Sequence, residues 1–308
     1  MGFAIPTSPK TPRPCPPLPG LRDGLSDHEF HTFRTLVATH CGIALGPHKR
    51  ALLQARLGRR LRTLGLTTFA EYHRILVQDD PHGEELVHFI NAVTTNKTEF
   101  YREAHHFAYL AEEWAPALIA RASRGGERSV RIWSAGCSTG EEPYTIAMTV
   151  ADALSHAGPW SVRILASDID TEVLARAESG TYSIEAAAGI PPAALKRHFL
   201  RGIGTSLGLM RARPALQSLV TFRRINLMED QWPLGASLDV IFCRNVLIYF
   251  DRPTQQRVLE RLAGSLKDDG VLILGHSEGM LGMMQRLRHV GHTIYRKEPA
   301  DACDHSRR

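Results

Sequence analysis

The sequence lacks any run of the ~18–20 apolar residues that a membrane-spanning helix requires, although 43% of its 308 residues are hydrophobic. Its first residues carry proline, threonine and basic side chains but no apolar stretch of the kind that a secretory signal contains. We therefore expect a cytoplasmic protein with no direct membrane insertion. The length favours one large or two modest domains.

Cysteine is scarce and scattered along the chain. None of the five cysteines belongs to a CxxC pair or to a cluster with zinc-like spacing. An odd, dispersed set is typical of reduced thiols, so we expect neither a disulfide nor a structural metal. The net charge of +5 favours an acidic partner, and composition alone does not choose between nucleic acid and an acidic protein surface.

The first third of the chain divides by composition. Residues 1–22 are rich in proline and have little apolar periodicity, which predicts a disordered arm. Residues 23–95 have helical periodicity, and Ser26 with Glu29 fits a capping box at the start of the first helix. Further helices are predicted over about 47–64, from 68 onward and over 83–94. Their short connections predict an N-terminal helical bundle, followed at 96–126 by a linker and a connector helix.

Residues 127–298 alternate between strand and helix patterns, which predicts an α/β domain with a mostly parallel sheet covered on both faces. The predicted strands lie at 130–134, 162–167, 238–243 and 271–275, and a hairpin is predicted from 287–290 and 293–296. Residues 179–222 break the alternation and predict a small antiparallel β-subdomain that follows a short helix. Residues 299–308 are expected to form a flexible tail.

The loop at 132–144 joins a strand to a helix through small residues. Ligands of open parallel sheets bind beyond the carboxyl ends of the strands, so this loop is a candidate binding site. It does not match the phosphate-binding pattern GxxxxGK[ST], because Glu141 and Glu142 stand where the lysine would be. Carboxylates repel phosphate but can hold an ammonium group. Such loops are also common as ordinary turns.

An acidic pair follows the next predicted strand. Asp168 ends that strand, where a carboxylate can accept hydrogen bonds from ribose hydroxyls. Asp170 precedes Thr171 and is predicted to cap the following helix. Together the two loops favour a cofactor that contains a nucleoside but no phosphate. Two further segments, 94–102 and 239–251, place polar side chains beside apolar ones, and alone they would be a capped turn and a buried strand with a core tyrosine.

These motifs resemble, in order, those of the CheR family of chemotaxis receptor methyltransferases, and the resemblance covers about residues 25–297. The segments that carry it are 94–102, 134–144, 167–170, 226–227, 242–251 and 276–278. The resemblance implies a Rossmann-like domain that binds S-adenosylmethionine (SAM), with a small antiparallel β-subdomain, preceded by the N-terminal helical bundle. It implies S-adenosylhomocysteine (SAH) as product and no metal.

The resemblance also implies the residues of the site. The cofactor contacts map to Asn96, Thr98, Arg102, Glu141, Asp168, Asn226, Leu227, Cys243 and Arg244. Glu142 remains an alternative to Glu141. The catalytic pair maps to Arg102 and Tyr249. The implied reaction transfers the methyl group of SAM to glutamate carboxylates of a chemotaxis receptor, for sensory adaptation. A glutamate with a pKa near 4.3 is ionised at neutral pH, so no general base is needed.

The second predicted helix carries a basic series. It comprises Arg50, Arg56, Arg59, Arg60 and Arg62. Such a series is usually a solvated face, whereas the resemblance favours a docking surface for the acidic, cytoplasmic methylation region of a receptor. It also leaves open a receptor C-terminal peptide bound at the β-subdomain. The role of Glu99, which stands where relatives often carry a small residue, is open.

Two rival functions fit parts of the sequence. The basic helix also suits a methyltransferase that acts on RNA, but the helical domain lacks the interleaved aromatic residues of a base-stacking platform, so we expect no nucleic acid partner. A non-enzymatic module that senses SAM or a receptor is the second rival. The presence of both Arg102 and Tyr249 argues against that module.

Overall fold

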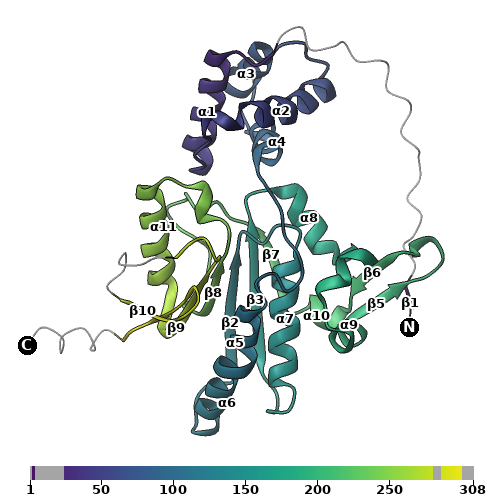
Figure 1. Cartoon of the computed structure of the whole chain (residues 1–308), viewed down its shortest axis with the longest axis vertical. Helices are drawn as coiled ribbons and strands as arrows, with labels where there is room; N and C mark the ends of the chain where they lie inside the picture. The colour runs from purple at the N-terminus through teal and green to yellow at the C-terminus, as the bar shows by residue number, and fades with distance from the viewer. Residues whose placement is uncertain (1, 4–23, 280–285, 300–308) are drawn as a thin grey trace, which may run out of the picture.

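The structure is a computed structural model, and it describes residues 2–3, 24–279 and 286–299. A group of helices near the N-terminus lies over one end of a large sheet, and a smaller sheet lies to one side (Figure 1). None of the helices within the described ranges combines the length and the apolar character needed to cross a bilayer.

The N-terminal domain is a bundle of four helices, as predicted. These are α1 (Asp27–Cys41), α2 (Arg50–Leu64), α3 (Phe69–Gln78) and α4 (Glu84–Val93). The capping box of Ser26 and Glu29 begins α1. The bundle core is aromatic, because the fully buried Phe33 ring lies 5.8 Å from that of Phe89 and 6.0 Å from that of Tyr72. Burial of these side chains holds the four amphipathic helices together.

The main sheet has seven strands in the order β10-β11-β9-β8-β2-β3-β7. Their bounds are β2 (Ser129–Ala135), β3 (Ser161–Asp168), β7 (Val220–Arg224), β8 (Leu238–Cys243), β9 (Leu266–Leu274), β10 (Leu287–Gly291) and β11 (Ile294–Lys297). The five strands from β9 to β7 are parallel, and β11 and β10 continue the sheet in antiparallel pairs. The predicted parallel sheet with a terminal hairpin is therefore confirmed.

Both faces of the sheet are covered by helices. Ile132 and Val240 belong to one buried cluster with Met148 of α7 (Glu141–Leu154). Trp133 and Ile241, their neighbours along the strands, belong to a second cluster with side chains of α11 (Arg252–Ser265). This alternation follows the two-residue period of a strand. The connector runs as α5 (His105–Tyr109), a π-helical turn (Leu110–Trp114) and α6 (Ala115–Ser123) on the α7 side.

The smaller sheet follows α8 (Thr171–Ser179) and has the strand order β1-β5-β6-β4. Its strands are β1 (Gly2–Phe3), β4 (Thr181–Ser183), β5 (Phe199–Gly202) and β6 (Leu209–Ala212), and its short helices are α9 (Pro192–His198) and α10 (Pro214–Gln217). The strands β4, β5 and β6 pair antiparallel, as predicted for the insertion.

Two sequence predictions need correction here. The insertion was placed at 179–222, but β7 pairs parallel with β3 at the edge of the main sheet. The arm at 1–22 was predicted to be disordered, but Gly2–Phe3 forms a strand on β5. The rest of that arm, and residues 300–308 of the predicted tail, lie outside the described residues. Local sequence patterns did not predict either pairing, because each depends on a strand that is distant in sequence.

Polar contacts fix the helical domain on the sheet domain. The Asn91 side chain donates to Thr171 Oγ1 at 2.9 Å and accepts from the Thr171 backbone N–H at 3.1 Å. Asn226 Nδ2 donates to the carbonyl of His40 at 2.6 Å, and Ile43 forms a β-bridge with Phe250. The loop between α1 and α2 is thereby held above the carboxyl ends of the strands.

The bundle core generates a stability prediction. Leu57 is fully buried on α2, whereas Leu64 on the same helix is 37% exposed. We expect Leu57→Ala to lower the free energy of unfolding by about 2–5 kcal/mol, because it leaves a cavity among packed side chains. Leu64→Ala is the matched control, with an expected loss below about 1 kcal/mol. Urea denaturation of both variants, followed by far-UV circular dichroism, measures the difference, and equal losses would contradict it.

Candidate active site

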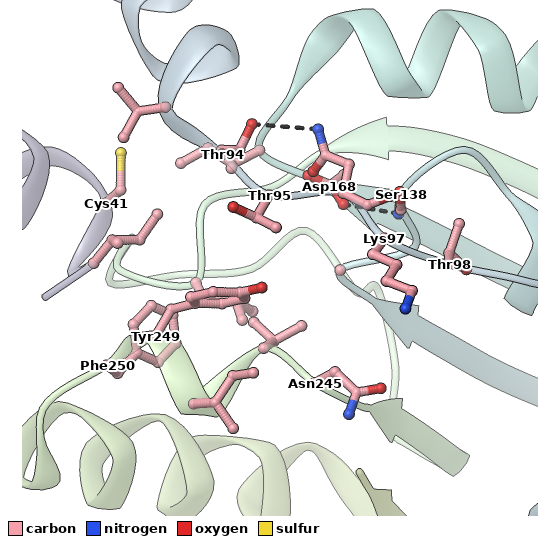
Figure 2. Close-up of a pocket in the computed structure, with 18 of the residues that line it drawn as sticks. Cys41, Thr94, Thr95, Lys97, Thr98, Ser138, Asp168, Asn245, Tyr249 and Phe250 are labelled. Atoms are coloured by element: carbon pink, nitrogen blue, oxygen red, sulfur yellow. Dashed lines mark hydrogen bonds between the residues drawn. The ribbon is translucent and has the colours of Figure 1, made fainter. Parts of the chain in front are cut away.

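A cavity of about 570 Å³ lies between the helical domain and the carboxyl ends of β2, β3 and β8 (Figure 2). Its size is that of a small-molecule pocket. The helical domain supplies Val93 and most of the stretch from Cys41 to Leu52, the segment after α4 supplies Thr94–Glu99 and Arg102, and the sheet domain supplies the rest. The site is therefore built by three parts of the chain that are far apart in sequence.

The loop after β2 forms the floor of the cavity, and its backbone lies close to Val246 and to the backbone of Ser167. Gly136 has a φ of 80°, and a Cβ atom there would lie 2.3 Å from Val246 Cγ2. Its N–H and that of Cys137 donate to the Ser167 carbonyl at 2.8 and 2.9 Å. Glycine is required where the backbone is left-handed and a side chain has no room. The small residues of this loop thus let the chain turn tightly beneath the cavity.

Asp168 lies at the end of β3 with little exposure and lines the cavity. Its Oδ2 accepts from the Ser138 N–H at 2.8 Å, and its Oδ1 accepts from the Asp170 N–H at 3.0 Å. Burial raises the pKa of this carboxyl, and the two backbone donors oppose that rise. A carboxylate has about four acceptor sites, so the group is fixed in place by its backbone donors and still able to accept a hydrogen bond from a ligand.

Asp170 caps α8 as predicted, and it has a second role that the sequence did not reveal. Its Oδ1 accepts from the N–H groups of Glu172 and Val173. Its Oδ2 accepts from Thr94 Oγ1 at 2.8 Å and from Asn96 Nδ2 at 2.7 Å. One carboxylate therefore begins a helix and also ties the linker to the cavity wall.

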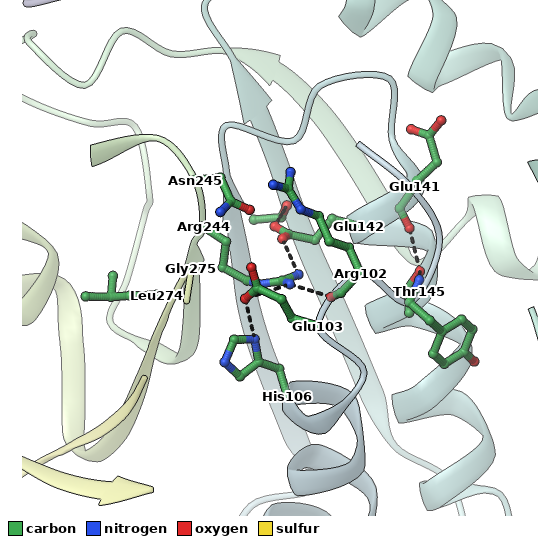
Figure 3. Close-up of polar contacts among 12 residues, drawn as sticks. Arg102, Glu103, His106, Glu141, Glu142, Thr145, Arg244, Asn245, Leu274 and Gly275 are labelled. Atoms are coloured by element: carbon green, nitrogen blue, oxygen red, sulfur yellow. Dashed lines mark hydrogen bonds and ion pairs between the residues drawn. The ribbon is translucent and has the colours of Figure 1, made fainter. Parts of the chain in front are cut away.

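A buried ion-pair network lies beside the cavity (Figure 3). The Arg244 side chain is almost fully buried, and its Nη1 lies 3.0 Å from Glu142 Oε2 while its Nη2 lies 3.2 Å from Glu103 Oε2. Arg244 also donates to the carbonyl of Arg102. Burial raises the pKa of Glu142, and Arg244 partly offsets that rise. Although burial also raises the pKa of Glu103, Arg244 and the N–H of His276 hold it below its usual value.

The two adjacent glutamates of the loop point in different directions. Glu142 lines the cavity and accepts from Ser134 Oγ at 2.7 Å. Glu141 accepts from Thr139 Oγ1 at 2.7 Å and is not among the cavity-lining residues. Both begin α7, where successive side chains diverge by about 100°. The geometry therefore favours Glu142, the alternative to Glu141, as the cofactor contact.

Strained backbone surrounds the cavity. Of six non-glycine residues with a left-handed φ in the described chain, four belong to its loops: Tyr101, Glu103, Ser138 and Asn245. Tyr101 and Glu103 flank Arg102, whose Nη1 donates to the Lys97 carbonyl at 2.9 Å. Such conformations are unfavourable by about 1–3 kcal/mol each and persist only where surrounding contacts enforce them. The turn that presents Arg102 is thus held by its neighbours.

Tyr249 lines the cavity across from Asp168, in the 3-10 turn Leu247–Tyr249 (Figure 2). Glu278, which the sequence left without a role, fixes that segment. Its buried carboxylate accepts from the N–H groups of Asn245 and Gly275, each at 2.7 Å, and from that of Ile248 at 3.2 Å. A buried carboxylate with backbone partners was not recognisable from spacing.

The structure gathers most of the predicted site residues. Those that line the cavity are Asn96, Thr98, Arg102, Asp168, Asn226, Leu227, Arg244 and Tyr249. Cys243 is fully buried and, like Glu141, lies outside the lining. The chemistry of the donor set suits SAM, because Asp168 and Glu142 offer carboxylates to hydroxyl and ammonium groups.

One cluster in the described chain has the spacing of a metal site. Glu103, His105 and His106 offer ligand atoms that lie within 4.8 Å of one another. Arg244, however, forms an ion pair with the same Glu103 oxygen, and a divalent cation there would be repelled by the guanidinium. Burial, reinforced by Arg244, lowers the pKa of His106 to about 2. We assign the Glu103 oxygen to the ion pair.

The fold and this cavity define a Rossmann-like, SAM-dependent methyltransferase. The sequence also matches two models of a single methyltransferase family. The family model for the CheR methyltransferase all-alpha domain matches residues 28–94, and the model for the CheR methyltransferase SAM binding domain matches residues 96–296. The chain belongs to the CheR methyltransferase family.

Named relatives support this membership. The chain is 47% identical to the chemotaxis protein methyltransferase of Escherichia coli K12, over 89% of this chain and 92% of that protein. It is 46% identical to chemotaxis protein methyltransferase 2 of Pseudomonas aeruginosa PAO1, over 87% and 92%. Among solved structures, PKMT2 from Rickettsia typhi in complex with AdoHcy aligns with 48% of this chain and 21% of its own, at 14% identity and a TM-score of 0.30. That likeness is too slight to carry an argument.

The adjacent glutamates generate a binding prediction. We expect Glu142→Gln to weaken SAH binding at least about 10-fold, because it removes the charge that faces both Arg244 and the cavity. Glu141→Gln is the matched control and should change the affinity less than about twofold, since that side chain is turned toward Thr139. Isothermal titration calorimetry with SAH measures both. The opposite ranking would return the cofactor contact to Glu141.

Proposed function

We propose that this chain transfers the methyl group of SAM to glutamate side chains of a chemotaxis receptor in the cytoplasm, forming methyl esters and SAH. The observation that carries the proposal is the cavity in which Asp168 and Glu142 lie together with Arg102 and Tyr249. Membership of the CheR family, whose named relatives are chemotaxis protein methyltransferases, supports the same reaction.

The acidic side chains fit the binding of the cofactor. We assign the ribose hydroxyls to Asp168, whose position is fixed by two backbone donors. We assign the ammonium group to Glu142, because it lines the cavity and because the single guanidinium of Arg244 is shared between two carboxylates, those of Glu142 and Glu103. Asn226 and Leu227 line the cavity near α1. When bound, SAM supplies a methyl group activated by a sulfonium. The contribution of the chain is to hold that methyl group in line with an incoming carboxylate.

The acceptor glutamate needs orientation and no general base, because its carboxylate is ionised at neutral pH. We assign the orienting role to Arg102 and Tyr249. The strained turn on either side of Arg102 and the Glu278 anchor below Tyr249 support this role, since both fix the backbone that carries these side chains. A tight ion pair with Arg102 would lower the nucleophilicity of the carboxylate, so positioning is favoured over charge neutralisation.

The catalytic assignment is tested by Arg102→Ala and Tyr249→Phe, assayed with tritiated SAM and receptor. We expect turnover to fall about 100-fold or more for Arg102→Ala, because a misplaced acceptor loses alignment. A smaller loss is expected for Tyr249→Phe, which keeps the ring. Arg252→Ala, on the exposed surface of α11, is the control. Base treatment should release the label as methanol, the product of a glutamate methyl ester. Unchanged turnover in both variants would rule out the pair.

The basic series on α2 divides into two groups. Arg50 pairs with Asp27, Arg60 pairs with Glu85, and Arg56 donates to the carbonyls of Val93 and Thr94. These three therefore stabilise the helical domain. Within the described residues, the exposed side chains of Arg59 and Arg62 have no recorded hydrogen bond or ion pair, and both border a shallow groove on α2. We infer that Arg59 and Arg62 supply the charge for docking the acidic methylation region of the receptor.

This division generates a docking prediction. We expect the double variant Arg59→Glu with Arg62→Glu to reduce receptor methylation at least about 10-fold at low salt and to leave SAH affinity unchanged. The difference from wild type should shrink above physiological ionic strength, because exposed charges are then screened within ~8 Å. The double variant Arg74→Glu with Arg176→Glu, on the exposed surfaces of α3 and α8, has the same net charge and is the control. Equal methylation by the double variant and the control would contradict docking at α2.

The β-subdomain is the second surface in the proposal. A small sheet with an available strand edge can bind an extended peptide by adding it as a further strand. We therefore propose that a C-terminal peptide of the receptor binds there. The support is the antiparallel pairing of β4, β5 and β6, together with the exposed apolar side chains of Ile203 and Leu207 beside β5.

A further inference from the structure

The edge of β5 is already occupied by this chain itself. Gly2–Phe3 pairs with β5 in parallel, with Gly2 opposite Arg201 and Phe3 opposite Gly202 (Figure 1). The other side of β5 pairs with β6, so without β1 the β5 strand would be an edge. Edge strands present unpaired N–H and C=O groups and are templates for a further strand. The structure fills this template with a segment that lies about 200 residues away in sequence.

The surroundings of β5 make it a suitable site for an added strand. A Cβ atom on Gly202 would lie 1.9 Å from the Ser206 carbonyl oxygen, so the turn after β5 folds closely against its end. In that turn the side chains of Ile203 and Leu207 are 54% and 73% exposed. The end of the turn is held by a hydrogen bond from the Ile184 N–H to the Gly208 carbonyl. Because β1 is parallel to β5, its direction runs toward these apolar side chains. Exposed apolar residues beside an available edge are typical of a binding surface.

We propose that the β5 edge is a strand-binding site whose resident ligand is the segment Gly2–Phe3 of this same chain, so that an extended segment of a partner binds only by displacing it. The proposal relies on the proposed function solely for the nature of that partner, a receptor peptide. The segment Gly2–Phe3 then acts as an intramolecular competitor for the second docking surface.

The tether sets the strength of this competition. Twenty residues, 4–23, join β1 to the start of the helical domain. Because β1 and β5 belong to the same chain, their pairing is intramolecular, and a free peptide has to exceed the effective concentration of the resident strand. The ladder covers only two residues, so few hydrogen bonds hold β1 on β5, and each of them is modest in strength. Occupancy is therefore displaceable, and we expect it to weaken binding of a competing peptide about 2- to 10-fold.

Disulfide trapping in the full chain tests the pairing. With Cys15 and Cys303 replaced by serine, the cysteines that remain are buried. We expect Gly2→Cys with Arg201→Cys to cross-link on mild oxidation, because these positions are opposite each other. Gly2→Cys with Arg176→Cys, on the exposed side of α8, is the matched control and should not cross-link. Peptide mapping by mass spectrometry measures the yields, and equal yields would overturn the proposal.

Peptide binding tests the competition. The probe is a fluorescein-labelled peptide with the sequence of residues 1–9, followed by fluorescence anisotropy. We expect full-length Phe3→Pro to bind it about 2- to 10-fold more tightly than wild type, because proline removes a backbone donor and weakens the resident strand. The oxidised Gly2→Cys/Arg201→Cys protein should not bind the probe until it is reduced. Equal affinity of Phe3→Pro and wild type, or no binding by Phe3→Pro, would overturn the proposal.

SAH calorimetry on the same samples separates this inference from the proposed function. The β5 edge is formed by residues that do not line the cofactor cavity. We therefore expect the oxidised, reduced and Phe3→Pro proteins to bind SAH with wild-type affinity. If SAH binds normally but Phe3→Pro and wild type bind the probe peptide equally, only the proposed competition by Gly2–Phe3 is wrong. If the wild-type protein does not bind SAH, the methyltransferase assignment is wrong instead.

Discussion

The buried guanidinium of Arg244 holds the site together. It joins Glu142 at the start of α7, Glu103 in the linker and the carbonyl of Arg102. Arg244 and these partners belong to three segments that meet only in the folded protein. A buried charge is tolerable only when its partners are in place, because desolvation is otherwise severely unfavourable. The network therefore requires the linker to adopt the strained turn that presents Arg102, and it couples that turn to the loop beneath the cavity.

Much of the fold could be predicted from the sequence because its signals are local. The capping box at Ser26, the alternation of strands and helices, and the hairpin near the end of the described chain each depend on neighbouring residues. The role of Asp170 as a helix cap was predicted for the same reason. The pairings of β7 and β1 were not, since a short strand carries no information about which distant edge it will join.

The site was predictable as a set of residue types and less so as a geometry. The motifs located the cavity and most of its lining residues. They did not decide between Glu141 and Glu142, because adjacent helical residues diverge and only packing against Arg244 separates them. They also gave no role to Glu278 or Glu103, whose partners are backbone N–H groups and a guanidinium from other segments. Hydrogen bonds to the main chain leave no residue pattern to recognise.

The cavity shares its walls between the helical domain and the sheet domain. Ala44 of the first donates to the Tyr249 carbonyl of the second, and Asn226 reaches back to His40. A ligand that contacts both walls stabilises their association by mass action. The thermal unfolding of the two domains should then merge into a single cooperative transition as the cofactor saturates. The concentration of the cofactor would in this way affect the stability of the enzyme as well as its turnover.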